Sequence, residues 1–295
     1  MTAYAAGGGG AVAPSLIIGP SVVSNFTSPS AIAVDLFGTI YVADNADETV
    51  TAYSPTANVN IATPIATIYN PFNAIGNFLG NDISGVAVDT AGNVYLSFSD
   101  SNTLGVFSGP NSGGVAQIAT IQGSGTGLSS PAGIALDSNG NIYVTNDGGS
   151  NLANFETVTV YPAGSSGDVP PTATIAGSNT GLAYPAGIAV DSSRKIYVAN
   201  KATDAVTVYS PGSNGNVTPI ATISGASTGL DSPAGITLDS SANIYVANEG
   251  GFEGANSSVT VYPPNSTGNA TPSFTISGPA TQLGRPLGVA IQVPQ

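Results

Sequence analysis

Short apolar stretches recur along the chain, separated by segments rich in Gly, Pro, Asn and Ser. Three copies of one segment are clear: SPAGIALDSNGNIYVTN (130–146), YPAGIAVDSSRKIYVAN (184–200) and SPAGITLDSSANIYVAN (232–248). Each copy holds two apolar pieces, rich in Val, Ile, Thr and Tyr, on either side of a polar turn. This pattern is typical of strands, and no helical period is present.

The repeat extends over the whole chain. Weaker copies occupy 28–44 and 82–98, and RPLGVAIQVPQ (285–295) is a truncated copy. Two further apolar pieces follow most copies. The third pieces are VTAY (50–53), LGVF (104–107) and VTVY (158–161, 206–209, 259–262), and the fourth are IATI (65–68, 118–121, 220–223), TATI (172–175) and SFTI (273–276). Four short strands recurring about every fifty residues predict the blades of a β-propeller.

The two ends of the chain predict how the ring closes. MTAY and SLII, within residues 1–18, match the third and fourth pieces, and the C-terminal RPLGVAI matches the first. The sequence therefore predicts an all-β, six-bladed propeller of four-stranded antiparallel blades, closed by a composite blade from both termini. The expected boundaries are strands C and D of the composite blade at 1–27, five blades at 28–82, 83–129, 130–183, 184–231 and 232–284, and strand A of the composite blade at 285–295.

One strand of the expected composite blade has no match. Nothing resembling IYVAN follows Ile291 or precedes Met1. Either this blade has three strands, or the chain is trimmed from a longer one, which the Met at the position of a usual Val favours. A gap at this place would also agree with a strand supplied by another chain.

Charge and composition exclude several function classes. The net charge is −13 over 295 residues, and the basic residues are Arg194, Lys195, Lys201 and Arg285. Four scattered cations cannot neutralise a nucleic acid backbone or an anionic membrane surface. The chain has no Cys and no His, which removes disulfides, thiolate chemistry and the commonest general base. No apolar stretch approaches the length of a membrane span, so membrane insertion is not expected.

The repeat resembles the NHL family and the related streptogramin-lyase-like propellers. The matching motifs are PAGIAVD, NIYVAN and VTVY. The resemblance implies the propeller fold but no particular function, because propellers host unrelated activities. NHL repeats usually carry Asn-x-Arg before the third strand, whereas this chain has Thr49, Thr157, Ala205 and Ser258 there. The basic surface of RNA-binding members and the histidine of the lyases are also missing.

An Asp closes each first strand, at positions 35, 89, 137, 191 and 239. A ring of metal ligands is one interpretation. A better one is that each carboxylate accepts a hydrogen bond from a backbone N–H two residues on, in a tight turn. The Gly and Ala of the PAG motif are expected to let the innermost strands pack closely near the axis.

The candidate binding site lies where second strands end and blades join. B–C loops and inter-blade loops share one face of a propeller, and loops of this kind often bind ligands. Solvated loops, with Asn residues that only cap strand ends, are the alternative. The candidate ligand-binding residues are Asn146, Asp147, Tyr184, Asn200, Asp231, Asn248, Glu249 and Arg285.

These observations favour a non-catalytic binding or scaffold propeller without a cofactor. We expect an extracellular or cell-surface location, in the style of a bacterial exported protein, with a protein or carbohydrate partner or self-assembly. The alternative is a divalent-cation-dependent, lactonase-like hydrolase at the central mouth. Its oxygen ligands for Ca²⁺ would be Asn146, Asn200, Asn248 and Glu249, with Asp147 or Asp231 as base.

Overall fold

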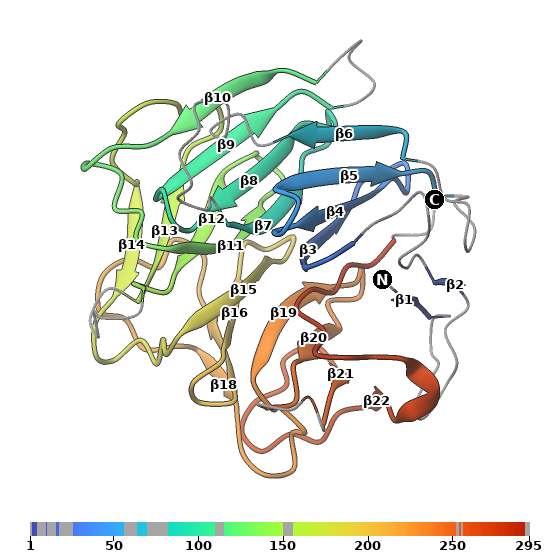
Figure 1. The fold of residues 1–295 in the computed structure, drawn as a ribbon. Coiled ribbons are helices and arrows are strands. Elements are labelled where there is room, and N and C mark those ends of the chain that lie inside the picture. The colour runs from blue at the N-terminus through green and yellow to red at the C-terminus, as the bar shows by residue number, and fades with distance from the viewer. Residues whose placement is uncertain are drawn as a thin grey trace.

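The protein is an all-β propeller with five four-stranded antiparallel blades arranged around a central axis (Figure 1). The computed structural model describes residues 2–4, 10, 16–17, 26–55, 64–69, 82–109, 115–149, 156–251, 254 and 256–292. Within these ranges, no helix is long and apolar enough to cross a membrane.

Each blade uses four consecutive strands in sequence order, from the axis outwards. Blade 1 consists of β3 (Pro29–Val34), β4 (Ile40–Asp44), β5 (Thr49–Tyr53) and β6 (Ala66–Tyr69). Blade 2 consists of β7 (Ile83–Val88), β8 (Val94–Phe98), β9 (Thr103–Phe107) and β10 (Gln117–Ile121). Blade 3 consists of β11 (Pro131–Leu136), β12 (Ile142–Asn146), β13 (Thr157–Tyr161) and β14 (Ala173–Ala176). Blade 4 consists of β15 (Pro185–Val190), β16 (Ile196–Asn200), β17 (Ala205–Tyr209) and β18 (Ala221–Ile223). Blade 5 consists of β19 (Pro233–Leu238), β20 (Ile244–Asn248), β21 (Ser258–Tyr262) and β22 (Phe274–Ser277), followed by the 3-10 turn η3 (Pro279–Thr281).

The innermost strands approach each other closely at the glycines of the repeated motif. A Cβ atom on Gly187 would lie 2.5 Å from the Ala234 carbonyl oxygen, and one on Gly133 would lie 2.5 Å from that of Ala186. A side chain at these positions would collide with the backbone of the next blade. The predicted role of the PAG motif is therefore confirmed.

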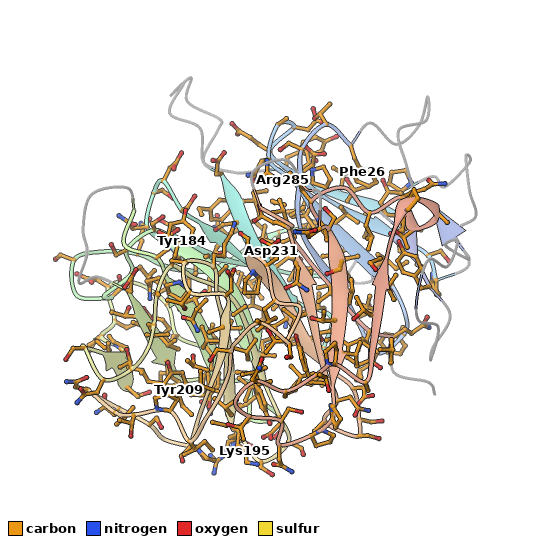
Figure 2. The ribbon with its side chains drawn as sticks, turned by 90° about the horizontal axis from the view of Figure 1, so that it is seen from below. Phe26, Tyr184, Lys195, Tyr209, Asp231 and Arg285 are labelled. Carbon is orange, nitrogen blue, oxygen red and sulfur yellow. The ribbon has the colours of Figure 1, made fainter. Side chains whose placement is uncertain are left out.

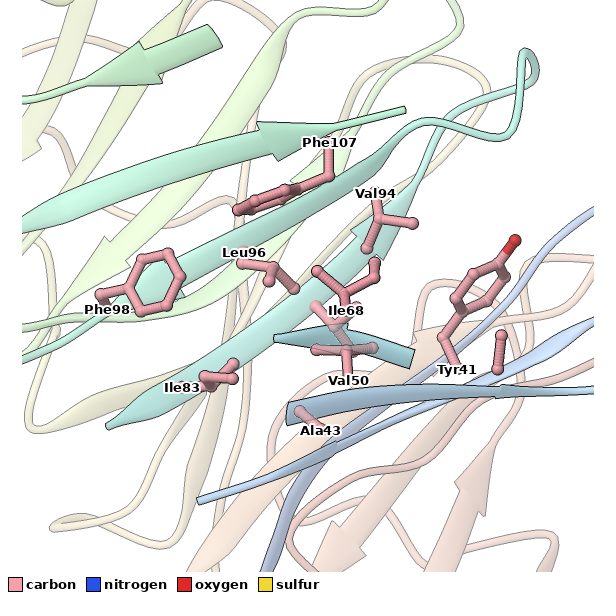
Figure 3. Packing of buried hydrophobic residues seen from close by; sticks show 11 residues of the cluster. Tyr41, Ala43, Val50, Ile68, Ile83, Val94, Leu96, Phe98 and Phe107 are labelled. Atoms are coloured by element: carbon pink, nitrogen blue, oxygen red, sulfur yellow. The ribbon is translucent and has the colours of Figure 1, made fainter. Parts of the chain in front are cut away.

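The hydrophobic core fills the spaces between neighbouring blades. Figure 3 shows the cluster between blades 1 and 2, where Tyr41 and Val50 face Leu96 and Phe98. Period-2 alternation sends successive side chains to opposite faces of a blade, and a blade between two others buries both faces. This explains why β9 and β17, in blades 2 and 4, are buried along their whole length.

Backbone hydrogen bonds join the outermost strand of one blade to a loop of the next blade. Gly167, in the loop before β14, forms a parallel bridge with Ile121 of β10, and its N–H donates to the Thr120 carbonyl at 2.6 Å. Gly215 and Gly268 repeat the arrangement with Ile175 and Ile223. These contacts use the exposed edge of each outermost strand, which would otherwise be open to pairing with other chains.

The Asp at the end of each first strand organises the following turn, as predicted. The Asp191 carboxylate accepts the N–H of Ser193 at 2.9 Å, the N–H of Lys195 at 2.8 Å and the Tyr197 hydroxyl at 3.2 Å. The carboxylates of Asp35, Asp89, Asp137 and Asp239 likewise bind the N–H two residues on.

The prediction of six blades is wrong, because the structure forms five four-stranded sheets. The N-terminal strands β1 (Thr2–Ala3) and β2 (Leu16–Ile17) pair only with each other. The expected innermost strand of the composite blade, at 285–292, has no strand structure. The physical reason is that the described residues contain no equivalent of β4 or β20 at this place, so the segment has no partner there with which to form a ladder.

The ends nevertheless lie between blades 1 and 5, where β1 and β2 are seen in Figure 1. Gly10 forms a parallel bridge with Ile276 of β22, and the Tyr4 hydroxyl donates to the Thr281 carbonyl at 2.5 Å. At the C-terminus, Gly288 lies against Gly235 on one side and Ile32 on the other. The rest of the predicted pairing, including Met1, residues 5–9 and 11–15, falls outside the described residues.

Candidate functional site

A cavity of about 640 Å³ runs along the axis of the propeller. Its wall is formed by the innermost strands β3, β7, β11, β15 and β19 and by residues 287–291. Antiparallel blades put the B–C and inter-blade loops at one end and the A–B turns at the other. Figure 2 shows this separation, with Tyr184 and Arg285 at one end and Lys195 at the other. The polar residues that rim the loop end of the cavity are Asn45, Asp82, Ser99, Ser130, Asp147, Tyr184 and Lys201.

The three predicted asparagines do not face this cavity. Asn146, Asn200 and Asn248 are fully buried. The Asn200 Oδ1 accepts the N–H of Ala183 at 3.0 Å, and its Nδ2 donates to the Val198 carbonyl and the Thr207 hydroxyl. Asn146 and Asn248 repeat this arrangement with the N–H groups of Ser129 and Asp231. Each Asn therefore fastens the loop that enters its own blade to the end of strand B.

Replacing Asn200 by Ala is expected to lower the free energy of unfolding by about 2–3 kcal/mol, because the partly buried N–H of Ala183 and the buried Thr207 hydroxyl lose their partner. Urea unfolding followed by circular dichroism measures the change. Asn179 is exposed and serves as the matched control, since Asn179→Ala should change stability by less than about 0.5 kcal/mol. Equal effects of the two substitutions would contradict the fastening role.

Charged residues from two blades and the C-terminal segment converge on the rim. Glu249, only 3% exposed, follows β20. One carboxylate oxygen is ion-paired with the Lys201 ammonium, and the other lies 2.9 Å from an Arg285 guanidinium nitrogen. Two of the four cations in the chain therefore bind one buried carboxylate. We call Asp147, Tyr184, Lys201, Glu249 and Arg285 the mouth cluster.

Tyr184 is the exposed aromatic member of the mouth cluster, with 45% of its surface accessible. The Lys201 ammonium lies 5.8 Å from the centre of its ring, within the range of a cation–π contact. Partial burial, together with the nearby carboxylates of Asp147 and Glu249, raises the pKa of the Tyr184 hydroxyl. At neutral pH this hydroxyl is therefore protonated and can donate a hydrogen bond.

A left-handed backbone conformation places both Tyr184 and Arg285. Their φ angles are 51° and 49°, and each precedes a proline. The preceding blade holds each residue in this unfavourable conformation: the Tyr184 N–H donates to the Glu156 carboxylate, and the Arg285 N–H donates to the Ser257 hydroxyl, both at 2.9 Å. Ser130 and Ser232 repeat this geometry. Two blades have Ser at this repeated position. Tyr184 and Arg285 occupy it in the other two places, and their larger side chains belong to the mouth cluster.

The remaining predicted residues divide between the rim and the loops. Asp147 lines the cavity, and its Oδ1 also accepts the N–H of Gly149 at 2.8 Å. Asp231 is not in the mouth cluster, because its carboxylate accepts the Asn256 side-chain amide at 2.8 Å. Lys201 was not among the predicted site residues. The sequence signal that could have identified it is that positively charged residues are rare in this acidic chain.

The predicted cation site is not assembled as expected. The amide oxygens of Asn146, Asn200 and Asn248 are bound to backbone N–H groups, and the Glu249 carboxylate is held by two cations. Over the described ranges, no three His, Cys, Asp or Glu residues gather in a way that could hold a metal ion. Binding of Ca²⁺ stays a prediction that this geometry does not favour.

Comparisons with known proteins agree with the propeller fold. The family model of a β-propeller repeat matches residues 115–153. A virginiamycin B lyase from Staphylococcus aureus, crystallised as an inactive variant with quinupristin, is 15% identical, with a TM-score of 0.55 over 84% of this chain and 73% of that one. A streptogramin B lyase is 14% identical, with a TM-score of 0.54 over 83% and 72%. A chain of a nidogen/laminin complex is 18% identical, with a TM-score of 0.62 over 90% and 85%.

No curated protein sequence matches the chain at a significant level. At identities of 14–18%, the likeness to the solved structures shows the fold alone. The predicted resemblance to the streptogramin-lyase-like propellers is confirmed at that level. The chain is a β-propeller with a recognisable β-propeller repeat in residues 115–153.

Proposed function

We propose that this chain is a non-catalytic binding propeller that contacts a protein partner through the mouth cluster. The observation that carries the proposal is the convergence of Lys201 and Arg285 on the buried Glu249 carboxylate, beside the exposed ring of Tyr184. Tyr and Arg are the residue types enriched in the energetically dominant positions of protein interfaces. Because Glu249 fixes both cations, they lose little side-chain entropy when a partner binds.

The chemistry of the rim supports binding rather than catalysis. The chain has no His or Cys, and its most buried carboxylate at the mouth is neutralised by two cations. A general base needs an accessible lone pair within reach of substrate. Both carboxylate oxygens of Glu249 are already engaged.

The propeller fold by itself does not distinguish a binding protein from an enzyme. Its structural neighbours include lyases and a chain from a complex between two proteins. The proposal therefore rests on the side chains of the mouth and not on these neighbours. An extracellular or cell-surface location is part of the proposal. It is supported by the Thr-, Ser-, Asn- and Gly-rich composition, in which only 7% of residues are charged.

The test is a binding comparison between two sets of substitutions on opposite ends of the propeller. The mouth variant is K201A/E249Q/R285A, in which Gln replaces Glu249 so that no unpaired charge stays buried. The control variant is R194A/K195A, at the A–B turn end. The control removes two positive charges, whereas the mouth variant shifts the net charge by only one unit, so net charge cannot explain a selective loss.

Biolayer interferometry against a panel of purified proteins measures the effect, with laminin included because a nidogen/laminin complex is among the structural neighbours. The mouth variant is expected to weaken any specific interaction at least tenfold, about 1.4 kcal/mol, while the control leaves it unchanged. Unchanged binding by the mouth variant, or selective binding of carbohydrates over every protein, would contradict the proposal.

A further inference from the structure

The junction between blades 1 and 5 contains a second cavity, of about 530 Å³. Apolar side chains of both blades face it, together with Thr2–Tyr4 of the N-terminus and residues 282–292 of the C-terminal segment. The apolar lining comes from Ile32, Val34, Ile40 and Val42 of blade 1 and from Val259, Phe274 and Ile276 of blade 5. At other junctions the corresponding faces are packed together in core clusters.

The C-terminal segment presents at this cavity a backbone edge that pairs with no strand in the described part of the chain. Beside Gly235, the Leu287 carbonyl and the Val289 N–H take the places that the Ala234 carbonyl and the Ile236 N–H take beside Gly187. In β19, Gly235 and Ile236 pair with Ala247 and Val246 of β20. Residues 287–291, by contrast, make no backbone hydrogen bond with any described residue. Such an edge is a template for β-strand addition.

An exposed N–H group, that of Gly284, marks one end of this edge. In blades 3, 4 and 5, the N–H two residues before the proline of the first strand is bound by the Asn that ends the second strand. Gly284 holds the same position before Pro286, and within the described part of the chain nothing accepts its N–H. This observation is independent of the cavity. Because Gly284 is exposed, its N–H is open to solvent and available to a side-chain oxygen of a bound partner.

We propose that this cavity binds an extended segment of a partner polypeptide, which pairs with residues 287–291 and caps the Gly284 N–H. The occupant is about five residues long, apolar, and ends in Asn or Asp. The second strands of the blades provide the pattern, because they occupy the equivalent place: IYVAD, VYLSF, IYVTN and, twice, IYVAN.

The charges of the cavity are complementary to this occupant. Arg285 is the single charged residue among the described residues of the lining, and it adjoins Gly284. The Asn or Asp oxygen of the occupant would meet both donors there. In blade 1 the side chain at this position is the carboxylate of Asp44, which accepts the N–H groups of Thr27 and Ser28. A partner strand with a charge in its middle would have to bury it against apolar side chains, which is costly.

Fluorescence polarisation with the labelled synthetic peptide SANIYVANEG, the sequence of residues 241–250, tests the proposal. The peptide is expected to bind the whole chain and to raise its melting temperature. Replacing the central Val of the peptide by Pro should abolish binding, because Pro cannot donate to the ladder and does not fit a paired strand. Replacing the second Asn of the peptide, the one that ends IYVAN, by Ala should weaken binding about fivefold, the effect of one hydrogen bond.

Substitutions at Gly284 locate the bound peptide. Gly284→Pro removes the proposed donor, whereas Gly284→Ala keeps it and meets open space. Gly284→Pro should weaken binding of the Asn peptide about fivefold and leave the Ala peptide unaffected, while Gly284→Ala changes neither. Circular dichroism verifies that both variants are folded.

Three results would overturn the proposal. They are no binding of the peptide at 1 mM (about 4 kcal/mol of binding free energy), equal binding of the Pro peptide, and identical behaviour of the two Gly284 variants. A dimer in light scattering that dissociates on adding the peptide would assign the cavity to a second copy of this chain instead. Arg285 also belongs to the mouth cluster. The Gly284 variants keep its side chain, and the mouth variant keeps the Gly284 N–H, so this proposal and the proposed function can fail independently.

Discussion

A methyl group added at Gly187 is expected to lower the free energy of unfolding by about 3 kcal/mol or more. The new Cβ would lie 2.5 Å from the Ala234 carbonyl oxygen and 2.9 Å from the Ile236 nitrogen. Both atoms belong to the backbone of the next innermost strand, so no side chain can rotate away. Relief requires β15 and β19 to separate, and each of these strands also packs against another neighbour in the ring.

Urea unfolding of Gly187→Ala, followed by circular dichroism, measures this loss. Gly284→Ala is the matched control, because its Cβ meets no atom within 4 Å and its φ is not in the left-handed region. The control should stay within about 0.5 kcal/mol of the natural chain. If both variants were equally stable, close packing at the axis would not be what requires glycine in the PAG motif.

The strands and turns of the blades could be predicted because each local signal is repeated. The turn role of the Asp residues follows from chemistry within six residues, such as Asp191 with Ser193 and Tyr197. The close packing of the PAG glycines needed only the assumption that equivalent strands surround one axis. Repetition turns a weak local pattern into a reliable architecture.

The number of blades could not be predicted in the same way. Sequence spacing matched the third, fourth and first strands at the two ends. It could not show that these pieces would form a sheet without a second strand. A ladder needs a partner for each edge, and residues 287–291 have none within the described chain. The result is a two-stranded sheet, a segment without strand structure and a cavity in place of a blade.

The sequence predicted the candidate site only in part, because the contacts that form it also join residues far apart in the chain. Asn200 ends a strand on the expected face, but its side chain enters the blade and binds Ala183, seventeen residues earlier. The geometry agrees better with the alternative interpretation, in which these Asn residues cap strand ends, than with a role in ligand binding. The ion pairs of Glu249 join residues 48 and 36 positions apart, and no local pattern reveals such contacts. The three-dimensional arrangement adds Lys201 to the site through its ion pair with Glu249.

Deleting residues 1–18 is expected to destabilise the chain strongly, although these residues do not complete a blade. They provide the Tyr4 hydroxyl bond to Thr281 and the Gly10 bridge to Ile276, the contacts that hold the N-terminus against blade 5. Thr2–Tyr4 also cover part of the apolar face that includes Phe274 and Ile276. Newly exposing on the order of 150 Å² of apolar surface would cost about 4 kcal/mol.

Thermal unfolding separates this covering effect from the loss of a single bond. Tyr4→Phe removes only the hydroxyl and should cost about 1 kcal/mol, whereas the deletion should cost several times more and increase binding of a hydrophobic dye. The innermost strands stay in contact from blade 1 to blade 5, and β7, β11 and β15 approach the next strand through their own glycines. The truncated chain should therefore still fold and melt cooperatively at a lower temperature. A deletion variant that melts like the natural chain would show that the N-terminal strands contribute nothing to joining blades 1 and 5. A deletion no worse than Tyr4→Phe would instead assign their whole contribution to the Thr281 hydrogen bond.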